Sequence, residues 1–304
     1  MEDIIILILN YNSEKMTTDC VSNLLKISNK INILVVDNCS TDGSYDRLKL
    51  FFSKNDDQVE IIKCDSNSGY ARGNNYGMKY IREKYCEKKY VIVMNPDIII
   101  LNEKTIVGLY SFLERHKDYA IASCQAVFNN FWRMGTDYGW RRPSRHNLFW
   151  AGTFLGKLFA RNMNDNYESI KLIDNELATK VDVVSGCFFM ARISDMEKVN
   201  YFDDRTFLYY EENIISKKMS DIGKNEAILL DCYFYHNHEH KDKSLIDYRK
   251  RLFDRKCFHD SKMIYINNYS NMTGFPLLLC KCVNNIDFQI KKIIFSLIAS
   301  IKSR

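Results

Sequence analysis

The first hundred residues alternate between short apolar runs and amphipathic stretches, and this rhythm constrains the fold more than any other feature. The apolar runs are Ile4–Leu9, Ile31–Val36, Val59–Ile62 and Tyr90–Met94. The stretches between them, such as residues 14–28, place apolar side chains at helical spacing. Continuous apolar strands separated by helices indicate a parallel sheet that is covered on both faces. We therefore predict an α/β fold with a Rossmann-like, mostly parallel central sheet flanked by helices.

Cysteine usage and the start of the chain indicate the compartment. The 304 residues include ten cysteines, which are scattered through the predicted strands and helices. The chain begins Met1-Glu2-Asp3, whereas a secretory signal begins with basic residues and a longer apolar run. These features predict a reducing, cytoplasmic compartment. Cys280-Lys281-Cys282 lacks the spacing of a zinc site, and no nucleic-acid partner is expected.

Polar motifs follow the predicted strands at the points where they end. These motifs are Asn10-Tyr11-Asn12, Asp37-Asn38, Asp65–Gly69 and Asn95-Pro96-Asp97. Because open α/β sheets bind ligands at the carboxyl ends of their strands, the four motifs predict a binding site there. Residues 123–180 lose the rhythm, and we expect loops in that segment.

The segment after Asp37 and the segment from Asn67 to Gly77 both have a ligand-binding and a structural interpretation. Asp37 can accept hydrogen bonds from a base or ribose, or it can belong to a polar turn that caps the next helix. Glycines 69, 73 and 77 let the backbone approach a ligand at a helix N-terminus, which favours phosphate. The same glycines also suit a turn and a small helix-packing face. No Gly-Lys-Ser/Thr follows, so this is not a P-loop.

Three further groups offer catalytic chemistry. Asp97 can hold a hard divalent cation that bridges two phosphates, although Asn-Pro-Asp is also a common turn. One carboxylate of Glu211-Glu212 can accept a proton from an attacking hydroxyl, or the pair can mark a solvated helix start. His236 closes a strand and heads a cluster with His238 and His240, and its neutral imidazole can complete a metal site.

Taken together, these motifs resemble the rhamnosyltransferase-like group of glycosyltransferase family 2. The resemblance covers roughly residues 3–245 and continues after Asp97 in sequence order. Its motifs are Asn10-Tyr11-Asn12, residues 35–43, residues 67–77, Asn95-Pro96-Asp97, residues 184–190, residues 207–212, and His236 with Ser244. It implies a GT-A fold and an inverting transfer from a nucleotide diphosphate sugar.

The resemblance also implies a role for each matching residue. Asp97 corresponds to the metal-binding acid, His236 to a histidine that ligates metal or touches phosphate, and Glu212 to the general base. Here the acidic pair is Glu211-Glu212, so Glu211 is the second candidate base. The resemblance implies a divalent Mn²⁺ or Mg²⁺ cofactor and a nucleotide-binding set of Asn10, Asn12, Asp37, Asn67, Gly73, Asn74 and Asn95.

The expected organisation follows from these roles. Residues 1–240 form the GT-A domain, with a nucleotide-binding half at 1–100 and an acceptor half at 101–240. Residues 241–304 form a basic helical extension. The expected partners are a nucleotide diphosphate sugar donor and a hydroxyl of a glycan or lipid-linked glycan acceptor, in polysaccharide biosynthesis.

Two other function classes stay open at this point. A sugar nucleotidyltransferase shares the nucleotide-binding sheet, but it would place a Gly-rich, Lys/Arg-bearing loop where Asn10-Tyr11-Asn12-Ser13 stands. A catalytically inactive nucleotide-sugar-binding module would explain Glu211-Glu212 and Asn95. Retention of Asp37, Asp97 and His236 together argues against it.

The C-terminal tail predicts a peripheral contact with an anionic membrane surface. Residues 241–304 contain 13 Lys/Arg and 5 Asp/Glu, a net charge of +8. One helical face of this tail is apolar, and basic residues accompany it, which suits an amphipathic helix at the inner face of the cell membrane. The alternative is a helix packed on the catalytic domain or on a dimer partner. The apolar residues are Ile286, Ile290, Ile293, Ile294, Leu297 and Ile301, and the basic residues are Lys291, Lys292, Lys302 and Arg304.

Overall fold

The computed structural model describes residues 2–28, 30–55, 57–128, 131–132, 139–159, 171–237 and 248–302. Within these ranges the side chains of residues 128, 131–132, 157–159 and 299–302 are not described. The parts of the predictions that concern His238, His240, Ser244, Ile301, Lys302 and Arg304 therefore lie outside the described residues or side chains.

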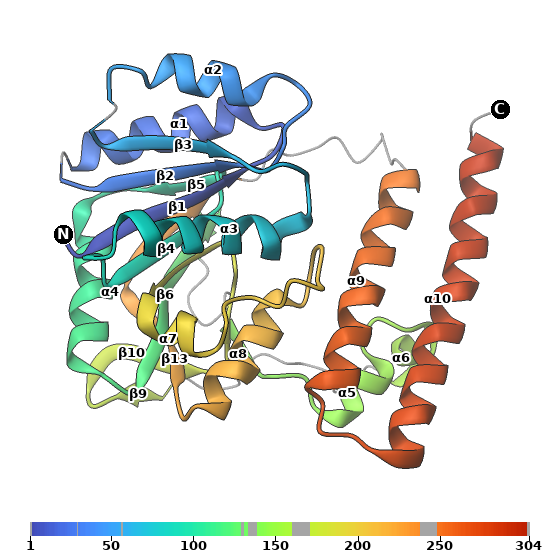
Figure 1. Cartoon of the computed structure of the whole chain (residues 1–304). Helices are drawn as coiled ribbons and strands as arrows, with labels where there is room; N and C mark the ends of the chain where they lie inside the picture. Colours follow the sequence, from blue (N-terminus) through green and yellow to red (C-terminus); the bar gives the residue numbers. More distant parts are fainter. Residues whose placement is uncertain are drawn as a thin grey trace.

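Strands and helices alternate through the first half of the chain, and the last segment is helical (Figure 1). The strands are β1 Ile4–Asn10, β2 Asn32–Asp37, β3 Val59–Lys63, β4 Tyr90–Met94, β5 Ile98–Ile100, β6 Tyr119–Phe128, β7 Phe131–Trp132, β8 Gly139–Trp140, β9 Leu172–Ile173, β10 Glu176–Val181, β11 Val183–Val184, β12 Phe188–Arg192 and β13 Asn225–His236. The helices are α1 Glu14–Ile27, α2 Ser44–Phe51, α3 Gly69–Lys84, α4 Glu103–Arg115, α5 Arg145–Trp150, α6 Phe154–Phe159, α7 Ile193–Lys198, α8 Glu211–Asp221, α9 Tyr248–Asn268 and α10 Gly274–Lys302.

One large sheet organises these elements, in the order β3-β2-β1-β4-β12-β6-β13-β10-β9. Strands β3, β2, β1 and β4 are parallel, and so are β6 and β13, whereas β12 runs antiparallel to β4 and β6. The order reverses between β1 and β4, which is where doubly wound sheets bind ligands. In Figure 1 these strands point towards the side of the molecule on which α9 and α10 stand. The predicted α/β class and its C-terminal helical region are confirmed.

Alternate side chains of each central strand enter two separate cores. On β1, Ile4, Ile6 and Ile8 pack with residues of α1 and α4, while Ile5 and Leu7 pack with residues of α3 and α7. Both faces of the strand are therefore covered, which is why its sequence is continuously apolar.

The sequence expectations hold for the central strands and fail between residues 123 and 180. The four predicted runs form β1, β2, β3 and β4, and residues 14–28 form α1. The expectation of loops is wrong for β6, α5 and β10. Strand β6 is rich in small residues and has no strong apolar periodicity, so its sequence gives little indication of a strand. Its neighbours β12 and β13 bury it in the folded sheet.

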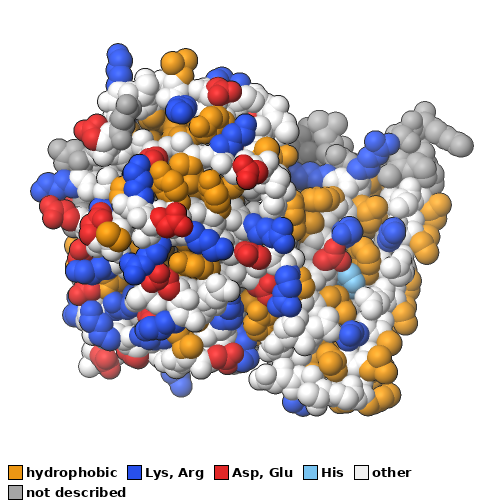
Figure 2. Space-filling view, viewed as in Figure 1, with side chains coloured by type: hydrophobic (Ala, Val, Ile, Leu, Met, Phe, Trp, Pro, Cys, Tyr) orange, Lys and Arg blue, Asp and Glu red, His pale blue; other side chains and the backbone are white. Residues whose placement is uncertain are grey.

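The two C-terminal helices form a separate layer. Helix α9 packs on α10 and α8, and a third core joins α5, α8, α9 and α10 around Leu148, Tyr210, Tyr265 and Cys280. Figure 2 shows hydrophobic side chains along the outer edge of α10. Among the described residues, no helix has the length and apolar character to cross a membrane.

Gly69 allows the loop before α3 to touch the turn that precedes α8. Its φ is +88°, in the left-handed region that favours glycine. The amide of Tyr70 donates to the carbonyl oxygen of Phe207 at 2.8 Å. A Cβ added at Gly69 would lie 2.1 Å from that oxygen, so this contact between distant segments requires glycine.

Gly69→Ala is therefore expected to lower the free energy of unfolding by about 3 kcal/mol, because left-handed strain adds to a backbone clash. Gly223→Ala is the matched control, since its φ is +75° but no described atom lies within 4 Å of its added Cβ. It should cost only about 1 kcal/mol. Urea denaturation of both variants measures the difference, and equal losses would contradict the proposed clash.

Candidate active site

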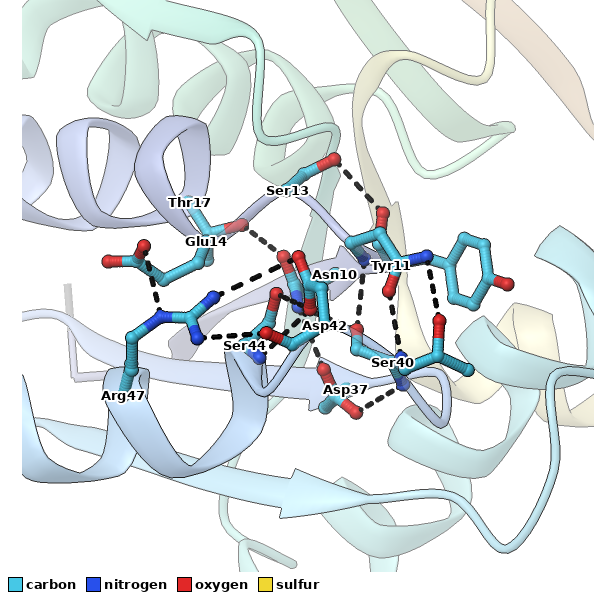
Figure 3. A network of polar contacts seen from close by, with 12 residues as sticks. Asn10, Tyr11, Ser13, Glu14, Thr17, Asp37, Ser40, Asp42, Ser44 and Arg47 are labelled. Atoms are coloured by element: carbon cyan, nitrogen blue, oxygen red, sulfur yellow. Dashed lines mark hydrogen bonds and ion pairs between the residues drawn. The ribbon is translucent and has the colours of Figure 1, made fainter.

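The ends of β1 and β2 are joined by a buried network of side chains (Figure 3). The Asn10 amide nitrogen donates to Asp37 Oδ2 at 2.8 Å and to Ser40 Oγ at 3.2 Å. Asn10 Oδ1 accepts from Thr17 Oγ1 at 2.7 Å, and Asp37 Oδ1 accepts from the Ser40 amide at 2.8 Å. Asn10 and Asp37 are fully buried, so in this arrangement they order the loop after β2.

Asn12 fixes the same loop at its exposed rim. It adopts a left-handed conformation with φ of 49°. Its side-chain Oδ1 accepts from the Thr41 backbone amide at 2.9 Å, and its backbone amide donates to Ser40 Oγ at 2.9 Å. The two strand-end motifs that the sequence singled out are therefore in direct contact, as expected for neighbouring parallel strands.

The Asn67 loop lies beside this network. Asn67 Oδ1 accepts from Asn38 Nδ2 at 3.0 Å and from the Gly69 amide at 3.1 Å. Gly73 is buried against β1, where a Cβ would lie 2.6 Å from Leu9 Cδ1. The Asn74 amide nitrogen donates to the Tyr70 carbonyl at 3.0 Å, and within the described residues its buried Oδ1 has no hydrogen-bond partner.

Asn75, which the sequence analysis did not select, connects α3 to the loop that leads to α8. Its Nδ2 donates to the Phe202 carbonyl at 3.0 Å and to Asp204 Oδ1 at 2.5 Å. Its Oδ1 accepts from the Phe202 amide at 3.0 Å. The second Asn of the Asn74-Asn75 pair therefore positions the loop that leads to Glu211.

Asp97 and His236 meet at the carboxyl end of β4. Strand β5 pairs with β13 so that Ile98 lies opposite His236, and the Asp97 carbonyl accepts from the Asn237 amide at 2.8 Å. This register brings His236 Nε2 to 3.1 Å from Asp97 Oδ2. Asn95 is also fixed here, because its amide donates to the Cys187 carbonyl at 2.8 Å.

Glu211 and Glu212 begin α8 directly after a strained turn. Tyr209 and Tyr210 both have positive φ, 73° and 67°, a conformation that is costly for residues other than glycine. Glu211 is only 3% exposed, and one of its carboxylate oxygens lacks a hydrogen-bond partner among the described residues. Glu212 is partly buried and its Oε1 accepts from the Gly186 amide at 3.3 Å.

Burial shifts the acid–base properties of this pair. Desolvation, followed by the negative charge of Glu212, raises the pKa of Glu211 to about 8. Desolvation also raises the pKa of Glu212. The pair therefore holds protons at a pH where exposed carboxyl groups are ionised, which suits groups that accept and release a proton near neutrality.

The segment Ser185–Cys187 lies between the metal candidate and the acidic pair. Tyr70 OH donates to the Gly186 carbonyl at 2.6 Å while the Gly186 amide donates to Glu212. Burial raises the pKa of the Cys187 thiol to about 12, and the charges of Asp97 and Glu212 both contribute. One short segment is therefore within electrostatic reach of both carboxylates.

Asp97 and His236 are suited to one side of a divalent cation site. Two ligands bound at about 2.1 Å and at right angles lie about 3.0 Å apart, close to their observed 3.1 Å. Within the described ranges no group of three or more His, Cys, Asp or Glu side chains is placed to hold a metal. Mg²⁺-like sites commonly use one or two protein ligands with substrate phosphates and water, so the two donors fit a cation shared with a diphosphate.

The structure thus brings most predicted site residues to one edge of the sheet. Asn10, Asn12 and Asp37 form one group, Asn67, Gly73 and Asn74 a second, Asn95, Asp97 and His236 a third, and Glu211 and Glu212 a fourth. Gly73 differs from the others, because it faces β1 and serves the packing of α3 against Leu9.

Comparisons with known proteins identify the family of the chain. The sequence model of glycosyl transferase family 2 matches residues 5–199, well over half of the chain. The low-salt glycan biosynthesis hexosyltransferase Agl10 of Haloferax volcanii is 28% identical over 298 residues, which is 97% of this chain and 83% of that protein. Rhamnosyltransferase WbbL of Escherichia coli K12 is 25% identical over 178 residues, 58% of this chain and 63% of its own length.

Solved structures share the fold. Mannosyltransferase PcManGT from Pyrobaculum calidifontis, in complex with GDP-Man and Mn²⁺, has a TM-score of 0.60 at 12% identity and aligns with 98% of this chain and 75% of its own. TarS 1-349 of S. aureus has a TM-score of 0.52 at 14% identity, covering 97% and 72%. The sequence resemblance is thereby confirmed: the chain belongs to glycosyl transferase family 2 and is a glycosyltransferase of its rhamnosyl- and hexosyltransferase-like group.

Proposed function

We propose that the chain transfers a sugar from a nucleotide diphosphate sugar to an acceptor hydroxyl with inversion at the anomeric carbon, assisted by a divalent metal. The observation that carries this proposal is the convergence of Asp97, His236 and Glu212 around the Ser185–Cys187 segment. Family membership favours glycosyl transfer over nucleotidyl transfer. Measured transfer of sugar from a bound donor would exclude the alternative of an inactive nucleotide-sugar-binding module.

The donor would lie along the carboxyl edge of β1, β2 and β4. The Asn67 loop would accept the nucleoside, and the fully buried Asp37, with Asn10 and Asn12, would order the loop after β2 that borders the same site. Asp97 and His236 would hold Mn²⁺ or Mg²⁺, which neutralises charge on a diphosphate leaving group when bound. The structural neighbour PcManGT supports this, because its complex contains GDP-Man and Mn²⁺.

Glu212 would act as the general base. Its carboxylate takes the proton of the acceptor hydroxyl while that oxygen forms a bond to the anomeric carbon. The bond between the same carbon and the diphosphate oxygen breaks on the opposite face, and the nucleoside diphosphate leaves. The Gly186 amide donates to Glu212, and Tyr70 fixes Gly186 through its carbonyl oxygen. The charge of Glu212 also helps to raise the pKa of the buried Glu211.

The domain assignment follows from these roles. Residues 1–240 would form the catalytic domain, in which 1–100 contact the nucleotide and 101–240 the acceptor. Residues 241–304 would form the extension. The name of the relative Agl10, a glycan-biosynthesis hexosyltransferase, supports a glycan acceptor, which we propose to be free or lipid-linked.

The outer face of α10 is proposed to rest on an anionic membrane surface, at the inner face of the cell membrane. Ile286 is 61%, Ile293 60% and Leu297 57% exposed, and helical spacing puts them on one face. The opposite face packs on α5 and α9 through Asn284 and Cys280. Exposed Lys292 lies to one side of the apolar face, and its charge complements that of anionic lipid.

Asp97→Ala is expected to reduce turnover by at least about 10² and to weaken donor binding, because the diphosphate loses its partner for charge neutralisation. Steady-state kinetics and donor-induced thermal stabilisation with Mn²⁺ measure the two effects. Asp19→Ala, an exposed position on α1, is the control. Unchanged turnover of the Asp97 variant, or full wild-type activity in excess EDTA, would disprove the metal assignment.

Glu212→Gln is expected to lower kcat by about 10² or more with nearly unchanged donor affinity, since the amide cannot take a proton. Glu211→Gln should be milder. A carboxylate base works only when ionised, and burial raises the pKa of both groups above 4.5. The wild-type kcat should therefore rise with pH over a range above that of an exposed carboxyl group, whose pKa is near 4.5. A profile that levels off where an exposed glutamate would be fully ionised, or a larger effect of Glu211→Gln, would reject this assignment.

The membrane contact is tested by a triple variant with Ile286, Ile293 and Leu297 changed to Ser. Loss of three exposed apolar side chains should lower binding to anionic vesicles at least about tenfold. The matched control changes Leu50, Phe51 and Leu177, which are 77%, 59% and 55% exposed, to Ser. Co-sedimentation measures both. Equal binding by the two triple variants would refute the membrane contact, and a loss of dimer only in the α10 variant would identify a second copy as the partner.

A further inference from the structure

A cavity lies away from the donor edge, between α9, α10 and the turn before α8. Its volume is about 430 Å³, within the range of small-molecule sites. It contains none of the strand-end residues assigned to the donor. The lining residues are Tyr209, Arg251, Asp254, Arg255, Phe258 and Phe295.

The charged side chains of this cavity are available to a ligand. Arg251 and Arg255 are exposed and stand one helical turn apart on the same face of α9. Among the described residues, Arg251, Asp254 and Arg255 form no hydrogen bond or ion pair with another side chain, and Arg251 only lies over the Tyr248 ring at 6.0 Å. Paired guanidinium groups bind phosphate oxygens through parallel hydrogen bonds.

The remaining lining suits a sugar. Tyr209, Phe258 and Phe295 offer aromatic surface to the apolar face of a pyranose ring. The Asp254 carboxylate repels a phosphate but accepts hydrogen bonds from hydroxyl groups. Two cations, one carboxylate and three rings together favour a phosphorylated sugar over a bare anion or an apolar molecule.

The cavity adjoins the proposed catalytic base. Tyr209 precedes Glu211 by two residues, and Phe258 packs on the rings of Tyr209 and Tyr210 at 6.2 and 5.3 Å between centroids. Ser261 of α9 donates to the Leu208 carbonyl at 3.0 Å. A ligand bound here therefore touches the turn that sets the position of Glu211 and Glu212.

We infer that this cavity is an acceptor subsite that binds the phosphate or diphosphate group of a phosphorylated sugar, with Arg251 and Arg255 as its anion-binding residues. The inference rests on the proposed glycosyl transfer and names the chemical class of its acceptor. The phosphate belongs either to a free sugar phosphate or to a lipid-linked sugar diphosphate. The same arginines serve both.

Calorimetric titration of the full chain with inorganic pyrophosphate in EDTA tests the subsite without metal at the donor edge. Arg251→Gln/Arg255→Gln should weaken binding at least tenfold. Lys250→Gln/Lys256→Gln removes the same charge from exposed positions of α9 that do not line the cavity, and it should stay within about twofold of wild type. Asp97→Ala should bind pyrophosphate like wild type. Equal weakening by both double variants, or loss of binding with Asp97→Ala, would overturn the inference.

A second set of titrations identifies the source of the phosphate. Glucose 1-phosphate represents the free sugar phosphate and a decyl diphosphate-linked glucose the lipid-linked one. A preference of tenfold or more for the decyl compound identifies a lipid-linked acceptor, and its absence identifies a free one. Failure of both compounds to bind would overturn the inference. Donor-induced stabilisation with Mn²⁺ should be unchanged in Arg251→Gln/Arg255→Gln, so loss of the subsite is distinguishable from failure of the proposed transfer.

Discussion

The site depends on the backbone of Gly186, which connects three parts of the chain. Its amide donates to Glu212, and its carbonyl accepts from Tyr70. A Cβ here would lie 3.0 Å from Glu212 Oε1 and 3.3 Å from Tyr70 OH, so no larger residue allows both contacts without displacement. Through this glycine the N-terminus of α3 and the start of α8 are fixed relative to each other. The next residue, Cys187, adds the segment after β4, because its carbonyl accepts from the Asn95 amide.

The central fold could be predicted because burial on both faces leaves a strong signal. Ile4–Leu9 alternates between two cores, and neither face tolerates polar residues, so the strand reads as an unbroken apolar run. Strand β6 has no such signal. Its small residues are buried by β12 and β13, which lie far from it in sequence, and tertiary pairing rather than local preference decides its conformation. The apolar face of α10 could be predicted from the sequence because helical spacing depends on one segment alone.

The acids and amides of the site could be predicted from their places at strand ends, but the hydrogen bonds that they form could not. Asn74 and Asn75 are neighbours in sequence, yet only Asn75 reaches across to Phe202 and Asp204. The left-handed turn at Tyr209 and Tyr210 also leaves no residue-type signal, since neither is a glycine. Packing of α9 against these rings offsets the strain. These contacts join segments between about fifty and 130 residues apart, and one sequence does not reveal them.

The two proposed phosphate sites, at the donor edge and in the cavity beside α9, differ in the sign of their charge. The donor edge gathers the carboxylates of Asp37, Asp97 and Glu212, and the raised pKa of the Cys187 thiol reflects burial together with the negative charge of Asp97 and Glu212. A diphosphate entering that edge meets repulsion unless a cation comes with it, which is why the Asp97–His236 pair favours metal assistance. The cavity beside α9 carries positive charge on Arg251 and Arg255 and would attract phosphate without metal. An acceptor phosphate would thus be drawn away from the donor's leaving group, with Glu212 and the hydroxyl to be deprotonated between them.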